Sequence, residues 1–372
     1  MSFFDLPKFV LAYVCSFFDL KSYAKFSLTN KIFYGSFFHI RELLKIVSKY
    51  SSIDLNQSIP RIIIQSGSRS ILHYVCEDKN ISIEMIRFLI DNKSDLNLRD
   101  KFNHFTPLHL ACKNKNVTIE MIKYLIENQS DFNLKDKYNN TPLHLAFTNI
   151  NISIEIIKYL VENKADLNTK NKYKSTPLHL AFNNSKVSTE MIKYMVENKS
   201  NVNLKSTSDY TPLHLACKKN YSVELIKFLI EKKSEITQKN EFGNSALCLA
   251  CDNKNISLDV IQYLVEYKSD LNLKGVYNRS GLHNACRNAN FSFETVKYLV
   301  EKKSVLNATD ENKNTPFHFV CKNRKVSFEI IKYFIENNAN LKALDDERKV
   351  ALHYIDEKLY EQVKNNLGDF FK

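Results

Sequence analysis

Apolar and polar positions repeat along the chain in a pattern that is clearest at residues Thr141–Ala146, which read TPLHLA. Each copy is centred on one apolar residue: Leu72, Leu108, Leu143, Leu178, Leu213, Leu247, Leu282, Phe317 and Leu352. Successive centres lie 36, 35, 35, 35, 34, 35, 35 and 35 residues apart. A period of this size, held over so many copies, is typical of a solenoid in which each repeat packs on its neighbours.

The pattern within one repeat predicts two short helices. Thr141 can cap the first helix through its hydroxyl, and Pro142 suits the first helical position because an amide there would have no partner. After a short turn, Ser153 can cap the second helix, with Glu155 in the first turn facing the positive helix end. The second helix carries an apolar stripe at helical spacing, formed by Ile154, Ile157, Leu160 and Val161.

The motif T-P-L-H-x-A at this period resembles the ankyrin repeat. The resemblance implies an all-α repeat solenoid with β-hairpin fingers, about nine repeats over residues 67–372, the last of them (Leu352–Leu367) a shortened C-terminal cap. At the finger tips the family's glycine remains only at Gly243, and is elsewhere replaced by Asn139, Lys174, Asp209 or Asn278. Asn and Asp tolerate the left-handed backbone of such a tip, whereas Lys174 is expected to be strained.

Eight of the ten histidines occupy one motif position: His73, His109, His144, His179, His214, His283, His318 and His353. The resemblance implies that they form structural hydrogen bonds between neighbouring loops. Catalysis would need one distinctive histidine beside a nucleophile or a carboxylate, and a row of metal sites would need further ligands in every repeat. Neither pattern occurs, and no phosphate-binding glycine loop is present. We therefore expect no enzymatic activity, no cofactor and no metal.

Six of the eight cysteines lie four residues after a motif centre: Cys76, Cys112, Cys217, Cys251, Cys286 and Cys321. Phe147 and Phe182 fill the same position in other repeats, so it is expected to be a buried apolar site. Cys248 and Cys251 form a C-x-x-C, a pattern of redox and zinc sites, but Cys248 replaces the motif histidine. We interpret these thiols as structural. Because no disulfide framework is evident, a reducing compartment is expected, the cytoplasm or also the nucleus.

A net charge of +12 raises the question of nucleic-acid binding. Many lysines on the second helices, however, precede a glutamate by four residues, as in Lys123–Glu127, Lys158–Glu162 and Lys332–Glu336. Opposite charges at this spacing are typical of a solvated helix face. Lysines so dispersed make a poor groove for phosphates, and we expect no nucleic-acid partner.

Residues 1–40 have a different pattern, in which Leu6-Pro7 is followed by three short apolar segments at helical spacing. With the ending Asn30–Tyr34, this order resembles the F-box, although Lys8-Phe9 stands where acidic residues are usual and Phe33 where Trp is common. The resemblance implies docking on the Skp-type subunit of a ubiquitin ligase. The docking residues would be Leu6, Pro7, Val10, Leu11 and Val14.

Other interpretations of the N-terminus stay open. Residues 1–40 also suit a helical cap over the exposed end of the solenoid. A signal peptide at Phe9–Phe18 is less favoured, because Asp5 and Pro7 precede the run and no small-residue cleavage site follows. The run is too short for a membrane span, which takes roughly 20 apolar residues. Residues 41–66 read as a helical linker or a degenerate repeat.

Aromatic residues recur at the predicted finger tips: Phe102, Tyr138, Tyr173, Phe242 and Tyr277. On projecting loops such rings are typical binding hot spots, although each could instead pack on the adjacent finger. We expect a monomer that binds a protein on the concave face formed by finger tips and first helices, without a membrane partner. The leading hypothesis is a substrate-recruiting adaptor of a cullin–RING (SCF-type) ubiquitin ligase. The alternative is an ankyrin scaffold without a ligase role, whose N-terminal helices act only as a cap.

Overall fold

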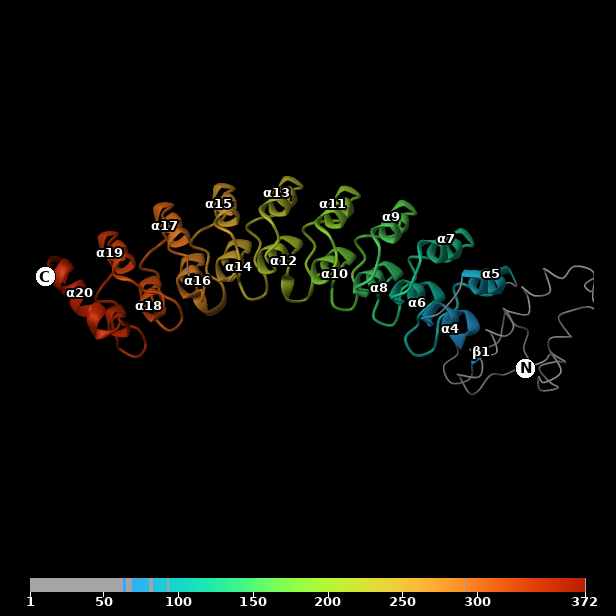
Figure 1. Cartoon of the computed structure of the whole chain (residues 1–372), viewed down its shortest axis with the longest axis horizontal. Coiled ribbons are helices and arrows are strands. Elements are labelled where there is room, and N and C mark those ends of the chain that lie inside the picture. The colour runs from blue at the N-terminus through green and yellow to red at the C-terminus, as the bar shows by residue number, and fades with distance from the viewer. Residues whose placement is uncertain (1–62, 65–68, 80–82, 92–93, 291, 372) are drawn as a thin grey trace, which may run out of the picture. The chain divides into compact units, whose positions relative to one another are not determined.

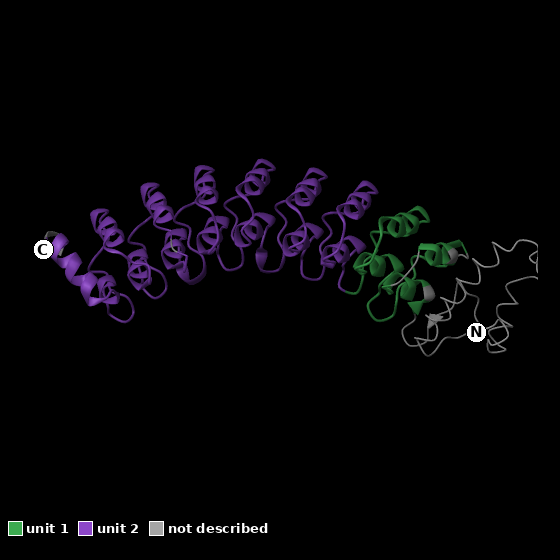
Figure 2. Cartoon of the chain, viewed as in Figure 1, with its two compact units in different colours: residues 1–137 green, residues 138–372 purple. Residues whose placement is uncertain are grey.

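The computed structural model describes residues 63–64, 69–79, 83–91, 94–290 and 292–371. The predicted F-box-like segment, residues 1–40, lies outside these ranges. The chain divides into two compact units, residues 1–137 and residues 138–372 (Figure 2). They are called unit 1 and unit 2.

In its described residues, unit 1 has a small antiparallel sheet and two pairs of helices. The strands are β1 (Ile63–Ile64) and β2 (Arg69–Ser70), with Ile63 opposite Ser70. The helices are α4 (Ile71–Glu77), α5 (Ile83–Asp91), α6 (Pro107–Lys113) and α7 (Ile119–Glu127). The first helix of each pair has seven residues and the second has nine.

Unit 2 continues this alternation of short and long helices. The seven-residue helices are α8 (Pro142–Thr148), α10 (Pro177–Asn183), α12 (Pro212–Lys218), α14 (Ala246–Asp252), α16 (Gly281–Arg287) and α18 (Pro316–Lys322). The nine-residue helices are α9 (Ile154–Glu162), α11 (Thr189–Glu197), α13 (Val223–Glu231), α15 (Leu258–Glu266), α17 (Phe293–Glu301) and α19 (Phe328–Glu336). Short 3-10 helices lie before α12 and α16: η3 (Thr207–Asp209) and η4 (Val276–Asn278). The chain ends with η5 (Ala351–Tyr354), α20 (Glu357–Leu367) and η6 (Gly368–Phe371).

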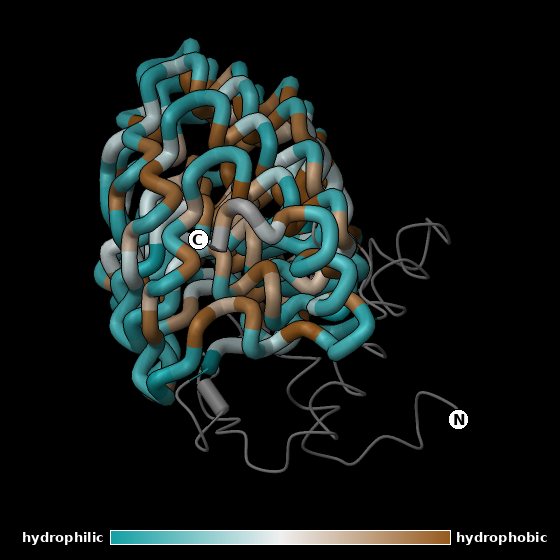
Figure 3. Tube along the Cα trace, turned by 90° about the vertical axis from the view of Figure 1, so that its left-hand side faces the viewer, coloured by the Kyte–Doolittle hydropathy of each residue, from teal (hydrophilic) through white to brown (hydrophobic). Residues whose placement is uncertain are grey.

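Within unit 2 the seven-residue helices form one row and the nine-residue helices form a second row beside it (Figure 1). The core lies between the rows, where Leu178 and Ile192 are both completely buried. Every motif centre from Leu72 to Leu352 exposes 5% of its surface or less, which confirms the predicted phase of the repeat. In the turned view of Figure 3, apolar stretches lie inside the stack and polar stretches predominate at its outer turns.

Six motif histidines bond to a carbonyl oxygen of the following repeat, as the resemblance implied: His73, His144, His179, His214, His283 and His318. His353 is exposed, which contradicts the expected structural role at that position. In α10 the N–H of Thr176 donates to Nδ1 of His179 at 3.2 Å, and Nε2 lies 3.0 Å from the carbonyl oxygen of Tyr210. A carbonyl oxygen only accepts, so Nε2 carries the proton and Nδ1 is the acceptor. The same arrangement links His144 to Ser175 at 3.1 Å. These rings are therefore neutral, buried parts of the frame.

The fingers, which we define as the turns from a second helix to the next first helix, differ from the expected β-hairpins. Their tips are closed by pairs of backbone hydrogen bonds, such as Asn171 N–H to Ser175 O at 2.9 Å together with Lys174 N–H to Asn171 O at 2.9 Å. Among the described residues, β-pairing is confined to β1–β2 and a single bridge between Leu344 and Val350. The described finger tips are therefore tight turns without a strand ladder.

Left-handed backbone recurs in unit 2 at the finger tips and after the nine-residue helices. At the finger tips it is adopted at the expected positions, with φ of 58° at Asn139, 52° at Lys174 and 75° at Gly243. The second series, which the sequence analysis did not predict, follows each nine-residue helix: Lys164, Lys199, Lys233, Lys268, Lys303 and Asn338. Glycine is the usual residue at such helix ends, and a side chain there is strained by about 1 kcal/mol.

Asparagine side chains supply a second set of links between repeats. Nδ2 of Asn184, just after α10, donates to the carbonyl oxygens of Phe147 at 3.0 Å and Asn149 at 3.2 Å. Asn253, Asn288 and Asn323 bridge their preceding repeats in the same way. The abundance of asparagine in the sequence therefore has a structural cause.

Candidate functional site

The predicted finger-tip aromatics lie where expected, and four of the five are exposed. Phe102, Tyr173, Phe242 and Tyr277 expose 60%, 57%, 49% and 55% of their surfaces. Tyr138 is half-buried, and the ammonium of Lys172 in the following finger lies 5.8 Å from its ring centre. Tyr138 therefore packs on the adjacent finger, whereas the four exposed rings remain accessible to a partner. The predicted docking residues Leu6, Pro7, Val10, Leu11 and Val14 lie outside the described residues.

Backbone hydrogen bonds hold neighbouring tips at fixed spacing. In unit 2 the carbonyl oxygen of Tyr138 accepts from Lys172 N–H at 2.7 Å, and that of Tyr173 accepts from Thr207 N–H at 3.0 Å. In unit 1 the carbonyl oxygen of Asn103 accepts from Lys137 N–H at 2.8 Å. Because the backbone of each tip is already fixed, its side chain loses little further entropy on binding.

One step of this finger-to-finger ladder in unit 2 is different. The N–H of Val276 donates to Oδ1 of the Asn244 side chain at 3.1 Å. Gly275 stands where neighbouring fingers have Asn240 or Asp310, and a Cβ at Gly275 would lie 1.8 Å from that same Oδ1. The asparagine side chain therefore fills the space that a finger side chain occupies elsewhere.

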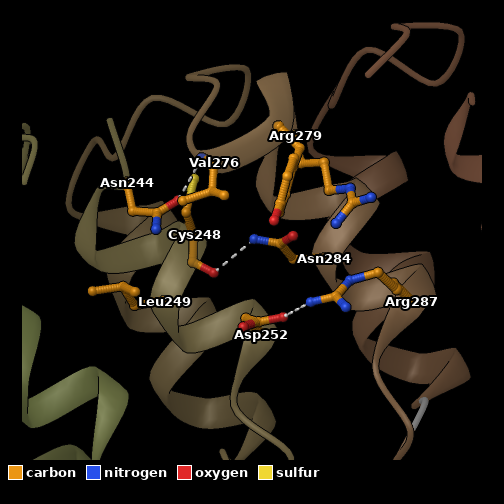
Figure 4. A pocket seen from close by; sticks show the side chains of 9 residues that line it. Asn244, Cys248, Leu249, Asp252, Val276, Arg279, Asn284 and Arg287 are labelled. Atoms are coloured by element: carbon orange, nitrogen blue, oxygen red, sulfur yellow. Dashed lines mark hydrogen bonds and ion pairs between the residues drawn. The ribbon is translucent and has the colours of Figure 1, made fainter. Parts of the chain in front are cut away.

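A pocket of about 210 Å³ opens beside this irregular finger, between α14 and α16 (Figure 4). Its polar lining comes from Asn244, Cys248, Asp252, Arg279, Asn284 and Arg287. The repeat pattern of the sequence does not predict this site. A signal was present, because Asn284 replaces the leucine of Leu145, Leu180 and Leu215, and a charged Arg279 replaces the asparagine of Asn140, Asn244 and Asn314.

The charged groups of the pocket form two ion pairs. Nε of Arg279 lies 3.1 Å from Oδ2 of Asp310, and Nη2 of Arg287 lies 2.6 Å from Oδ1 of Asp252. Between the two arginines, Nδ2 of Asn284 donates to the carbonyl oxygen of Cys248 at 3.1 Å. Figure 4 shows Asn284 and both arginines side by side along one wall. Such a wall presents N–H donors to a ligand that accepts hydrogen bonds.

The C-x-x-C thiols beside the pocket are suited to packing rather than to redox chemistry. Burial raises the pKa of both Cys248 and Cys251 above the usual range, whereas reactive cysteines have lowered values. Sγ of Cys248 donates to the carbonyl oxygen of Leu273 at 3.4 Å, in the place of the histidine Nε2–H of other repeats. In the described part of the chain, no three His, Cys, Asp or Glu side chains are grouped to hold a metal ion.

Comparison with known families identifies the repeat. Five overlapping stretches match the family described as ankyrin repeats (3 copies): residues 72–171, 150–240, 178–275, 219–310 and 282–358. No F-box domain is detected, and a search of the curated proteins finds no match. None of the helices in the described ranges is long and apolar enough to cross a membrane. Since the matches together span residues 72–358, the chain belongs to the ankyrin-repeat proteins, whose repeats imply a protein–protein interaction module.

Proposed function

We propose that this array of about nine repeats is a non-catalytic adaptor that binds a partner protein through its finger tips. The observation that carries the proposal is the exposure of the tip aromatics, 49–60%, on backbones that hydrogen bonds hold in register. Large apolar side chains kept in water on a rigid backbone are typical of binding hot spots. Burying them against a partner recovers hydrophobic free energy at a small entropic cost.

The test is affinity capture with variants that remove the tip rings. Tyr173, Phe242 and Tyr277 are replaced together by serine, the residue that Ser208 already provides at this position. In the matched control, serine replaces the exposed Ile150 and Tyr267, which lie after α8 and α15 and not at finger tips. Proteins retained by wild type and by the control, and lost by the tip variant, support the proposal. An unchanged set in the tip variant contradicts it.

A more specific proposal concerns the N-terminus. Docking of residues 1–40 on a Skp-type subunit would make the chain a substrate-recruiting adaptor of an SCF-type ubiquitin ligase, with the repeats holding the substrate. Its support is the F-box-like spacing of apolar residues in the sequence. Co-purification with a Skp-type subunit tests it: wild type should bind, and a Leu6→Ala, Pro7→Ala double variant should lose binding. Equal binding by the double variant, or none by wild type, rejects the ligase role.

The alternative is an ankyrin scaffold whose N-terminal segment only caps the solenoid. Capping is a general need of solenoids, because an end repeat exposes the apolar face that the next repeat would cover. Deletion of residues 1–40 separates the two roles. A pure cap predicts aggregation of the shortened chain with every partner retained. A ligase adaptor predicts loss of the Skp-type subunit while the substrate stays bound.

A further inference from the structure

Two arginines at the same position of different repeats have closely similar settings. Arg69 in unit 1 and Arg279 in unit 2 both lie three residues before their motif centres. Nε of Arg69 lies 2.9 Å from Oδ2 of Asp100, and Nε of Arg279 lies 3.1 Å from Oδ2 of Asp310. Both aspartate side chains are completely buried. Each guanidinium is thus held at its Nε edge by the next finger.

The two repeats differ in the partner of the outer guanidinium edge. Eight residues after Arg69, Glu77 places Oε2 at 2.7 Å from Nη1 of Arg69. Eight residues after Arg279 the chain has Arg287, a second cation, which pairs with Asp252 instead. Within the ranges that the structure describes, Nη1 and Nη2 of Arg279 therefore lack the carboxylate that Arg69 receives from its own repeat.

The guanidinium of Arg279 is fixed in place before any ligand arrives. Its carbon lies 4.9 Å from the ring centre of Tyr277 and 4.9 Å from that of Phe319. The side chain is 14% exposed and lines the pocket beside Asn284 (Figure 4). An arginine held by an ion pair and two rings loses little freedom on binding, so its remaining N–H groups suit a planar, bidentate acceptor.

We propose that this pocket binds a carboxylate side chain, Asp or Glu, of the partner polypeptide, in the position that Glu77 takes on Arg69. This proposal rests on the protein-binding function of the finger surface. A volume of about 210 Å³ is below the roughly 300 Å³ at which whole-ligand sites begin, and suits a single side chain. Because Asp252 and Asp310 already offset the two arginines, one negative charge is matched better than the nearly doubled charge of a phosphate.

Two pocket variants and one control follow from the repeats themselves. Arg279→Asn installs the residue that Asn244 and Asn314 carry at the same position, so the fold should tolerate it. Arg287→Glu, at an exposed position, recreates the Arg69–Glu77 pair and fills the site with the chain's own carboxylate. Arg324→Asn makes the same chemical change as the first variant in an exposed turn, and serves as the control.

The probe is a random peptide library displayed on phage and selected on the immobilised full-length chain. Wild type and Arg324→Asn should select peptides enriched in Asp or Glu, and both pocket variants should lose this enrichment. Changing the acidic residue of one selected peptide to its amide should weaken wild-type binding about tenfold or more, as for loss of a hydrogen-bonded charge pair. Circular dichroism confirms that every variant is folded.

Three results overturn the proposal. Peptides without acidic enrichment, or enrichment that persists in both pocket variants, reject the carboxylate site and leave the protein-binding function standing. Tighter binding of a phosphoserine copy of the selected peptide assigns the pocket to phosphate instead. Selection of no peptide at all rejects the carboxylate site together with the proposed function.

Discussion

Nε2 of His179 lies 3.0 Å from the carbonyl oxygen of Tyr210, one finger further along the chain. The bond that Nδ1 accepts from the Thr176 N–H requires a neutral ring, because protonation of Nδ1 would remove the acceptor. Burial lowers the pKa of His179 to about 4 from an ordinary 6.5, and the pKa values of His214 and His283 also to about 4. The same histidines that join the repeats therefore make the array sensitive to acid.

Acidification should destabilise the array at pH values that are still above the lowered pKa of the folded histidines. A group with a lowered pKa in the fold contributes its full stability above the unfolded value of 6.5, and loses it as pH falls towards about 4. At about pH 5 the loss is about 2 kcal/mol for a histidine such as His179. Urea unfolding at about pH 7 and about pH 5, followed by circular dichroism, measures the difference.

The control for this pH dependence is His179→Cys. Cys248 shows that a thiol, which carries no positive charge at acid pH, can occupy the histidine position and donate to the next finger. The variant should be less stable than wild type near pH 7 but should lose less stability on acidification. An equal loss in wild type and variant would show that carboxylates elsewhere cause the acid sensitivity.

Removal of one asparagine link should weaken the junction between two repeats. In Asn184→Ala the carbonyl oxygens of Phe147 and Asn149 lose their side-chain donor in a buried setting. The expected destabilisation is about 1–3 kcal/mol, measured by denaturant unfolding. Asn183→Ala, next to it but exposed, is the matched control and should change stability little. Similar effects of both changes would refute the asparagine link.

The left-handed lysines predict a stabilising substitution. Lys199 has φ of 75° just after α11, so Lys199→Gly relieves side-chain strain and should stabilise by about 0.5–1 kcal/mol, net of the entropy that glycine adds to the unfolded chain. Lys193→Gly makes the same exchange inside α11 and should destabilise by about 1 kcal/mol. Thermal melts of both variants should show a higher melting temperature for Lys199→Gly and a lower one for Lys193→Gly. A loss of stability in Lys199→Gly would show that its side chain makes contacts that outweigh the strain.

Truncation in the core tests the phase of the repeat. Leu178 is completely buried at a motif centre, and Leu178→Ala should destabilise by roughly 2–5 kcal/mol because it removes packed methyl groups and leaves a cavity. Denaturant melts measure the change. A loss below about 0.5 kcal/mol would be expected of a surface position and not of the core.

Much of the repeat core could be predicted from the sequence, because the same contacts recur about every 35 residues. The buried motif centres and the capping threonines follow from TPLHLA and its spacing, and the histidine links are implied by the resemblance to the ankyrin repeat. The burial of Cys217 and Phe182 likewise follows from their shared position. These features recur in most copies, although Cys248 replaces the histidine of one copy and Val350 the threonine of another. Each recurrence supports the interpretation.

Features that depend on the backbone or on single repeats were missed. The predicted Lys–Glu spacing holds for Lys332–Glu336, which meet at 3.8 Å, but Lys158 and Lys227 lie over Tyr194 and Tyr263 of the following repeats. Side-chain spacing along one helix does not reveal a ring supplied by the next helix. The pocket at Arg279 was missed for the opposite reason, because its residues are exceptions to the repeat.

Site-specific photo-crosslinking tests the finger-tip contact most directly. A photoreactive phenylalanine analogue is placed at Tyr173 in one preparation and at Tyr267, exposed after α15, in another. Each is irradiated with the partner that wild type captures. A covalent adduct at Tyr173 and none at Tyr267 is the result that a finger-tip binding surface predicts. An adduct at Tyr267, with none at Tyr173, would contradict it.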